Sequence, residues 1–180
     1  MTIPTKPFQV LLIGAGNRGA EVYGEWIRAN PGQLRIAAVA EPIESRRITV
    51  AGQHQIPAER QFSTWEDALA AGRLADVAVI ATQDQNHTAP TLAAMQAGYD
   101  VLLEKPMAHR LEDCVALVQA AERSGRVLQI AHVLRYTEFF QQLFRSALSY
   151  SPGKVLLKTH RCFQVDIRII GPVYQCYILI

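Results

Sequence analysis

Cysteine is scarce in this sequence, and its spacing suggests neither a metal site nor a disulfide framework. The three cysteines are Cys114, Cys162 and Cys176. No apolar run approaches the roughly 20 residues of a membrane-spanning helix. The start, MTIPTKPFQ, lacks the charged flank and the apolar block of a signal peptide. We therefore expect a cytoplasmic protein with no metal ligands and no membrane partner.

The sequence also has almost no excess of one charge sign over the other. The formal net charge is +2 over 180 residues. Because the sequence also has no basic stripe, this small net charge gives no reason to expect a nucleic acid as partner. The hydrophobic content of 49% and the charged content of 19% are typical of a globular domain. This length suggests one domain, or one domain and a fragment of another.

Alanine and glutamate are missing from the end of the chain. Residues 1–147 contain 24 alanines and ten glutamates, and residues 148–180 contain none of either. The formal charge also changes, from −1 over the first 147 residues to +3 over the remainder. We interpret residues 149–180 as an atypical tail, the truncated or frame-shifted remnant of a second domain. No catalytic role is expected there.

Before the tail, apolar strands alternate with helical segments. Strands are expected at residues 8–14, 34–41, 75–82, 100–104 and 126–133. Helices are expected at 20–30, 44–54, 63–72, 89–98, 110–125 and 137–148, with Ser63 and Glu66 at capping-box spacing. This alternation predicts an α/β fold, a doubly wound parallel sheet of Rossmann type, over residues 7–148. A second, substrate-binding domain is expected to be largely missing.

A glycine-rich turn, GAGNRG, follows the first strand and opens a helix. Gly14, Gly16 and Gly19 have the G-x-G-x-x-G spacing, and Asn17 and Arg18 complete the turn. The first glycine permits a tight turn, the second lets the backbone approach a pyrophosphate, and the third lets helix and strand pack closely. Free N–H groups at the helix start then favour phosphate. The alternative is a plain tight βα turn.

An acidic residue ends the second strand, 22 residues after Gly19. Glu41 at this position would accept hydrogen bonds from the ribose hydroxyls of NAD and repel the 2′-phosphate of NADP. Arg46 and Arg47 follow, and an arginine turned inward could hold that phosphate. Their alternative interpretation is a solvated helix surface. The sequence favours NAD and leaves NADP open.

Two further strands end in polar clusters, ATQDQNH at residues 81–87 and EKP at residues 104–106. In open α/β sheets, ligands bind beyond the carboxyl ends of the strands. These clusters are therefore expected at a nicotinamide and its substrate.

The sequence resembles the oxidoreductases of the glucose–fructose oxidoreductase and inositol dehydrogenase type, the Gfo/Idh/MocA family. The resemblance covers residues 7–148 and rests on GAGNRG, the AT…NH segment, AGYDVLLEKPMA and AHVLRY. It implies a dinucleotide-binding domain followed by an α/β domain that carries much of the substrate pocket. It also implies a homo-oligomer for the full-length protein and a small-molecule substrate, a sugar or cyclitol.

The EKP segment has the most specific implications. Lys105 matches the family's active-site lysine, whose ammonium can hydrogen-bond the reacting oxygen. Glu104 matches a residue that helps orient the nicotinamide ribose and the lysine. Pro106 matches a proline often preceded by a cis peptide bond. The alternative for the triplet is a strand end with a surface ion pair.

Other matches are less specific. Thr82, Gln83 and His87 match the loop beside the nicotinamide ribose, and His87 could equally be a structural residue at a helix start. His132 and Arg135 match positions near the substrate entrance, where an arginine could bind an anionic or polyhydroxylated substrate. A structural crossover contact is the alternative for this pair.

The resemblance also has a gap. Relatives carry an aspartate and a histidine four residues apart on a helix that opens the second domain, and this sequence has no such pair. We expect an NAD(P)-dependent oxidoreductase domain that transfers hydride between a nicotinamide and a secondary alcohol. Two alternatives stay open: a dinucleotide-binding module without turnover, and an NAD-dependent glycoside hydrolase of the same family.

Overall fold

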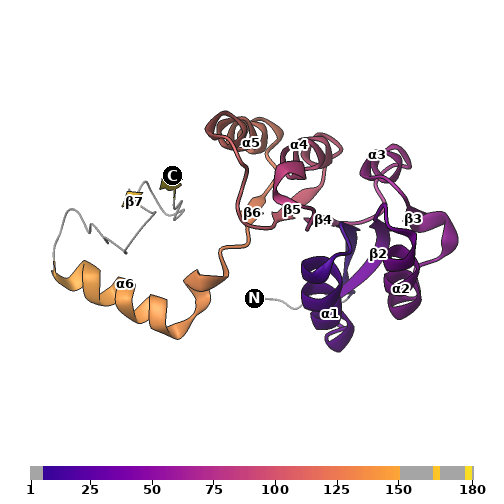
Figure 1. The fold of residues 1–180 in the computed structure, drawn as a ribbon, viewed down its shortest axis with the longest axis horizontal. Helices are drawn as coiled ribbons and strands as arrows, with labels where there is room; N and C mark the ends of the chain where they lie inside the picture. Colours follow the sequence, from indigo (N-terminus) through magenta and orange to yellow (C-terminus); the bar gives the residue numbers. More distant parts are fainter. Residues whose placement is uncertain (1–5, 151–163, 167–176, 180) are drawn as a thin grey trace. The chain divides into compact units, whose positions relative to one another are not determined.

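The computed structural model describes residues 6–150, 164–166 and 177–179 (Figure 1). By its internal contacts the chain divides into two compact units, Met1–Ala131 and His132–Ile180. The candidate coenzyme site belongs to the first unit.

The first unit is built on one sheet of six parallel strands. These are β1 (Phe8–Ile13), β2 (Leu34–Ala40), β3 (Gln61–Phe62), β4 (Val77–Ile80), β5 (Asp100–Leu103) and β6 (Leu128–Ile130). Their order is β3-β2-β1-β4-β5-β6, and every pairing is parallel. The chain runs outward from β1 to β3, then crosses back and runs outward from β4 to β6. The switch point therefore lies between β1 and β4, where a doubly wound sheet binds its ligand. The predicted Rossmann-type fold is confirmed.

Helices cover both faces of this sheet. On one face lie η1 (Asn17–Gly24), α1 (Glu25–Ala29) and α2 (Glu44–His54), and on the other lie α3 (Trp65–Ala70), α4 (Thr88–Gln96) and α5 (Leu111–Ser124) (Figure 1). Each face has its own core, because successive strand residues point to opposite sides. Leu11 and Ile13 of β1 pack with α4 and α5, while Val10 and Leu12 pack with α1 and α2.

Several local expectations differ from the structure. The helix expected at 20–30 begins at Asn17, and its first eight residues form a π-helix, a form often found at functional sites. The cap of α3 is Thr64, whose hydroxyl accepts the amide of Asp67 at 3.1 Å, so the expected Ser63–Glu66 box was wrong. The two-residue edge strand β3 was not predicted. The strands expected at 75–82 and 126–133 are also shorter than anticipated.

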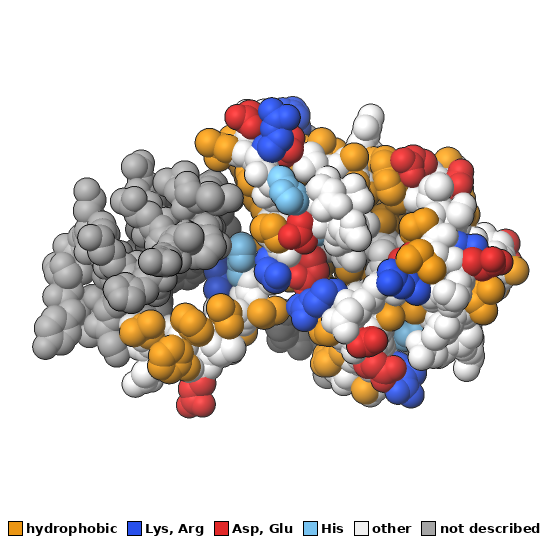
Figure 2. All heavy atoms as spheres, in the orientation of Figure 1, with side chains coloured by type: hydrophobic (Ala, Val, Ile, Leu, Met, Phe, Trp, Pro, Cys, Tyr) orange, Lys and Arg blue, Asp and Glu red, His pale blue; other side chains and the backbone are white. Residues whose placement is uncertain are grey.

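The second unit contains η4 (Val133–Tyr136) and α6 (Glu138–Tyr150), followed by β7 (Gln164–Asp166) and β8 (Tyr177–Leu179) in antiparallel pairing. Its first part exposes large apolar side chains, with Tyr136 69% and Phe139 70% exposed (Figure 2). The predicted tail from residue 149 lies mostly outside the described residues, so the predicted domain boundary stays a prediction.

Two kinds of feature are missing from the described part of the chain. None of its helices has the length and hydropathy that crossing a bilayer requires. Within the same residues, no three histidine, cysteine, aspartate or glutamate side chains gather in a way that could hold a metal ion.

Candidate coenzyme site

The glycine turn requires glycine at its first and third positions. Gly14 has a φ of +92°, and a Cβ there would lie 2.6 Å from the carbonyl oxygen of Ala81. A Cβ on Gly19 would lie 1.9 Å from the carbonyl oxygen of Gly14. Both separations are far inside van der Waals contact. The turn is therefore pressed between its own helix and the end of β4.

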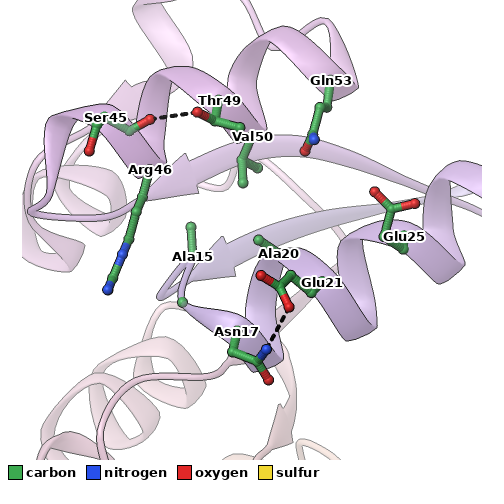
Figure 3. Close-up of a pocket in the computed structure, with 11 residues that line it drawn as sticks. Ala15, Asn17, Ala20, Glu21, Glu25, Ser45, Arg46, Thr49, Val50 and Gln53 are labelled. Carbon is green, nitrogen blue, oxygen red and sulfur yellow. Dashed lines mark hydrogen bonds between the residues drawn. The ribbon is translucent and has the colours of Figure 1, made fainter.

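The middle glycine has the opposite environment. A Cβ on Gly16 would meet only Nη1 of Arg46, at 3.9 Å. The space above Gly16 is thus open, as a backbone that approaches a pyrophosphate requires. This space belongs to a groove between the glycine turn and α2 (Figure 3). Its walls are formed by Ala15, Gly16, Asn17, Ala20, Glu21, Glu25, Ser45, Arg46, Thr49, Val50 and Gln53.

Glu41 faces the glycine turn from the end of β2 and is only 4% exposed. Its Oε2 accepts the backbone N–H of Ala15 at 2.7 Å, and its Oε1 accepts the backbone N–H of Ile43 at 3.0 Å. The carboxylate therefore joins the ends of β1 and β2. Its predicted contact with a ribose stays a prediction.

The two arginines that follow Glu41 have different surroundings. Arg47 is half-buried, and its Nη1 donates to the backbone carbonyl of Glu41 at 2.6 Å. Arg46 is exposed and points across the groove toward Ala15 and Asn17 (Figure 3). Of the two guanidinium groups, only that of Arg46 lines the groove.

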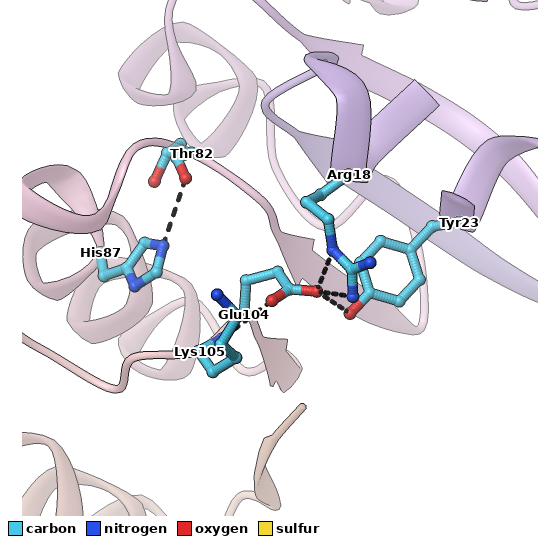
Figure 4. A network of polar contacts seen from close by, with 6 residues as sticks. All are labelled: Arg18, Tyr23, Thr82, His87, Glu104 and Lys105. Carbon is cyan, nitrogen blue, oxygen red and sulfur yellow. Dashed lines mark hydrogen bonds and ion pairs between the residues drawn. The ribbon is translucent and has the colours of Figure 1, made fainter. Parts of the chain in front are cut away.

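Glu104 is held by donors from across the switch point. Arg18 donates to Oε1 from Nε at 2.8 Å and from Nη2 at 2.6 Å, and Tyr23 donates to the same oxygen at 2.7 Å (Figure 4). The other oxygen accepts the backbone N–H of Lys105 at 3.0 Å. The Arg18 guanidinium also lies 5.8 Å from the centre of the Tyr23 ring. This cluster ties η1 to the end of β5.

The cluster shifts the acidity of its members. Burial of the Glu104 carboxyl acts to raise its pKa, but the bonds from Tyr23, Arg18 and the Lys105 amide outweigh burial and hold the pKa below 4.5. Burial, and then the carboxylate of Glu104, raise the pKa of Tyr23 well above 10. At neutral pH the tyrosine is therefore a donor and the glutamate an acceptor.

Lys105 directly follows Glu104 at the end of β5. Its side chain is exposed, and in the described part of the chain its ammonium has no hydrogen-bond or ion-pair partner. The peptide bond between Lys105 and Pro106 is cis, as the family resemblance implied. The charged end of the lysine is therefore available to a ligand.

The loop after β4 contacts the segment that contains Pro106. His87 is 1% exposed, and its Nδ1 and Nε2 lie 2.7 Å from the carbonyl oxygen of Pro106 and 3.2 Å from that of Thr82 (Figure 4). Thr82 is half-buried, whereas Gln83 is exposed and pairs with Gln85. The histidine therefore links two loops from within, and the exposed positions of this loop face solvent.

His132 and Arg135 begin the second unit. His132 precedes η4, and the Arg135 amide donates to its carbonyl oxygen at 3.0 Å. Their predicted place near a substrate stays a prediction. Tyr23, in contrast, could not be predicted from the sequence, since a tyrosine one turn beyond a glycine motif has no distinctive spacing.

Fold and site together define a dinucleotide-binding Rossmann domain of an oxidoreductase. The family model described as the oxidoreductase family with an NAD-binding Rossmann fold matches residues 8–132. The chain belongs to this family, Gfo/Idh/MocA, as its motifs indicated.

Individual relatives agree with this assignment. The chain is 27% identical over 154 residues to inositol 2-dehydrogenase of Corynebacterium glutamicum strain R. This alignment covers 85% of this chain and 44% of that protein. It is 30% identical over 159 residues to the rhizopine catabolism protein MocA of Rhizobium meliloti, over 88% of this chain and 47% of that protein.

Solved structures share the fold. The WlbA dehydrogenase of Bordetella pertussis, solved with NADH and UDP-GlcNAcA, superposes with a TM-score of 0.73 at 24% identity, over 84% of this chain and 46% of that one. The chain thus spans less than half the length of the relatives it matches.

Proposed function

We propose that this chain provides the coenzyme half of an NAD(P)-dependent oxidoreductase that transfers hydride between a nicotinamide and a secondary alcohol carbon. The observation that carries the proposal is the bond between Arg18 and Glu104. It joins the helix of the glycine turn to the strand end that bears Lys105. A dinucleotide laid along this edge would meet the turn with its phosphates and Lys105 with its nicotinamide end.

The residues of the glycine turn fit a bound dinucleotide. The open space over Gly16 is compatible with a pyrophosphate, and η1 begins at the next residue, where free N–H groups of a helix start favour phosphate. We propose that Gly14, Gly16, Asn17, Arg18 and Gly19 form this subsite. We propose that Glu41 lies beside one ribose, and that the loop of Thr82, Gln83 and His87 lies beside the nicotinamide ribose. The bound nicotinamide supplies the site that accepts or donates the hydride.

Lys105 is the proposed catalytic residue. Its exposed ammonium can donate a hydrogen bond to the reacting oxygen and so stabilise the negative charge that develops there. We propose that Glu104 helps to orient the nicotinamide ribose and Lys105 from beneath the site. Its side chain is 5% exposed, and both its oxygens accept hydrogen bonds, one of them from the Lys105 amide.

The proposed substrate class comes from the relatives. Those named inositol 2-dehydrogenase act, by their names, on a cyclitol, and WlbA was solved with a nucleotide sugar. We propose that the whole protein acts on a sugar or cyclitol, and that His132 and Arg135 lie near the substrate entrance. A homo-oligomer is proposed for the full-length protein on the family resemblance.

A second candidate is a dinucleotide-binding module without turnover. This sequence contains no histidine four residues after an aspartate, which favours this candidate. A glycoside-cleaving or eliminating reaction is also compatible with relatives named 2,7-anhydro-N-acetylneuraminate hydratase, one of which is 33% identical over 70 residues.

Titration of the chain with NADH, followed by nicotinamide fluorescence, tests the proposal. We expect saturable binding that Gly16→Val abolishes by filling the open space. Reduction of NAD is then assayed with myo-inositol and aldoses. Turnover that falls by about 100-fold or more in Lys105→Met supports the enzyme, and binding without turnover supports the module. Binding of neither NADH nor NADPH to the folded chain would disprove both.

A further inference from the structure

We infer that a second groove in the first unit binds a small phosphate-bearing anion, held by three arginine side chains. This arginine groove lies between the C-terminal ends of α4 and α5 and has a volume of about 650 Å³. That volume is within the range of small-molecule sites. The inference does not depend on the proposed function, because none of the residues that line the arginine groove belongs to the candidate coenzyme site.

The arginine groove lies at the edge of the sheet opposite to the candidate coenzyme site. The helices α4 and α5 lie side by side on one face of the sheet (Figure 1). Arg73, Gly98 and Arg126 come shortly before β4, β5 and β6. Because these strands are parallel, the three residues lie at the amino ends of the strands. Glu104 and Lys105 follow the carboxyl end of β5. An anion in the arginine groove would therefore not overlap with a dinucleotide at the glycine turn.

Three guanidinium groups line the arginine groove, those of Arg73, Arg123 and Arg126. Nε of Arg73 donates a long hydrogen bond, 3.4 Å, to the carbonyl oxygen of Ala75. Nη1 of Arg126 donates one of 3.5 Å to the carbonyl oxygen of Gly98. In the part of the chain that the structure describes, Arg123 has neither a hydrogen bond nor an ion pair. Most N–H groups of the three side chains are therefore left for a ligand, and a guanidinium can donate two parallel bonds to a phosphate.

The positive charge of the arginine groove exceeds the negative charge around it. A cation at a helix C-terminus interacts favourably with the helix dipole, so part of this charge stabilises the fold. Each helix end contributes only about half a negative charge, and both α4 and α5 end here. Asp100 adds one carboxylate, 4.0 Å from Arg126, and no aspartate or glutamate of the described residues lines the groove itself. Three guanidinium charges thus outweigh about two negative ones, which favours binding of an anion.

Apolar side chains at the base of the arginine groove indicate the kind of anion. Leu92, Met95 and Ala120 line it, and Met95 is only 1% exposed while Leu92 and Ala120 are half-buried. A ligand with an apolar group beside its phosphate would bury that group against these side chains. We therefore assign the arginine groove to a phosphate ester that carries an apolar or aromatic group, rather than to inorganic phosphate.

Titration of the full chain with phenyl phosphate at constant ionic strength, followed by two-dimensional amide NMR, tests the inference. We expect saturable shifts of the amides of Gly98, Ser124 and Arg126. Phenyl phosphate should bind more tightly than inorganic phosphate, because its ring buries apolar surface. Arg73→Gln and Arg123→Gln should each weaken binding by about tenfold, the effect expected for a lost charged hydrogen bond. Acetate, with a single charge, should cause no saturable shifts at these amides.

Arg110→Gln is the matched control, because it makes the same change in charge as Arg123→Gln at the other end of α5. Arg110 is exposed there and pairs with Glu112. The control should leave the dissociation constant unchanged. Equal weakening by the two variants would overturn the inference, since binding would then depend on net charge alone. Shifts that do not saturate, or that are confined to the glycine turn, would also overturn it. Inorganic phosphate that binds as tightly as phenyl phosphate would disprove the assignment to an ester with an apolar group.

Discussion

The guanidinium of Arg18 donates two hydrogen bonds to Oε1 of Glu104, at 2.8 and 2.6 Å, although 86 residues separate the two in sequence. The bond joins the two halves of the sheet at the switch point. One of its partners is a residue of the glycine turn, and the other precedes Lys105. The geometry of the phosphate end and that of the lysine are therefore coupled through one buried carboxylate.

Tyr23→Phe is expected to raise the pKa of Glu104, because the carboxylate loses one of the donors that stabilise its charge. It should also lower the free energy of unfolding by about 1 kcal/mol. A carbon-13 NMR titration of Glu104 and urea denaturation measure the two effects. The control is Tyr99→Phe, which removes another buried hydroxyl, bonded to Leu74 and Gly72. That variant should lose stability and leave the Glu104 pKa unchanged.

The stability of the chain should fall in acid partly through Glu104. Its folded pKa lies below 4.5, so the folded chain binds this proton more weakly than the unfolded chain does. Its contribution is therefore complete above about pH 5 and is lost as the pH falls through the folded pKa. Urea denaturation across this range should show a flatter acid decline for Glu104→Gln. A slope identical to that of the wild type would contradict the assignment.

Substitution of the third glycine should be severe. A Cβ on Gly19 would collide with the carbonyl oxygen of Gly14, which is backbone and cannot move aside cheaply. We expect Gly19→Ala to cost about 3 kcal/mol or more. Gly52→Ala in α2 is the control, because nothing lies within 4 Å of its Cβ position. It should stabilise the chain by about 0.5–1 kcal/mol. Thermal denaturation compares the two.

Self-association should depend on the apolar side chains of the second unit. Phe139 is 70% exposed and Phe140 is 41% exposed, in edge-to-face contact with each other. Exposed aromatic surface of this kind promotes association, so Phe139→Ser should increase the monomer fraction in sedimentation velocity at micromolar concentration. Leu111→Ser, in α5 of the first unit at a position that is 64% exposed, should have little effect. A single sharp monomer boundary for the wild type, with no larger species, would count against the prediction.

The elements with strong local patterns were predicted well. The helix at 44–54 has the predicted bounds, and the order of strands and helices followed from alternating apolar runs. The glycine turn was predicted because its spacing has a direct steric cause, which the short contacts of Gly14 and Gly19 confirm. These features are encoded in residues close together in the sequence.

What could not be predicted depends on distant partners. A π-helix and an α-helix have similar apolar patterns, and the edge strand β3 has only two residues. The bonds of Glu104 to Arg18 and Tyr23 form only when β1 and β5 are placed in one sheet. The inward orientation of Glu41 depends in the same way on the amide of Ala15.

The buried imidazole of His87 has a consequence for how a ligand could be enclosed. Because it contacts the carbonyls of both Thr82 and Pro106, it joins the loops after β4 and β5 into one unit. Two loops joined in this way have little freedom to fold over an incoming molecule. A substrate would then have to be enclosed by other segments that move toward these loops.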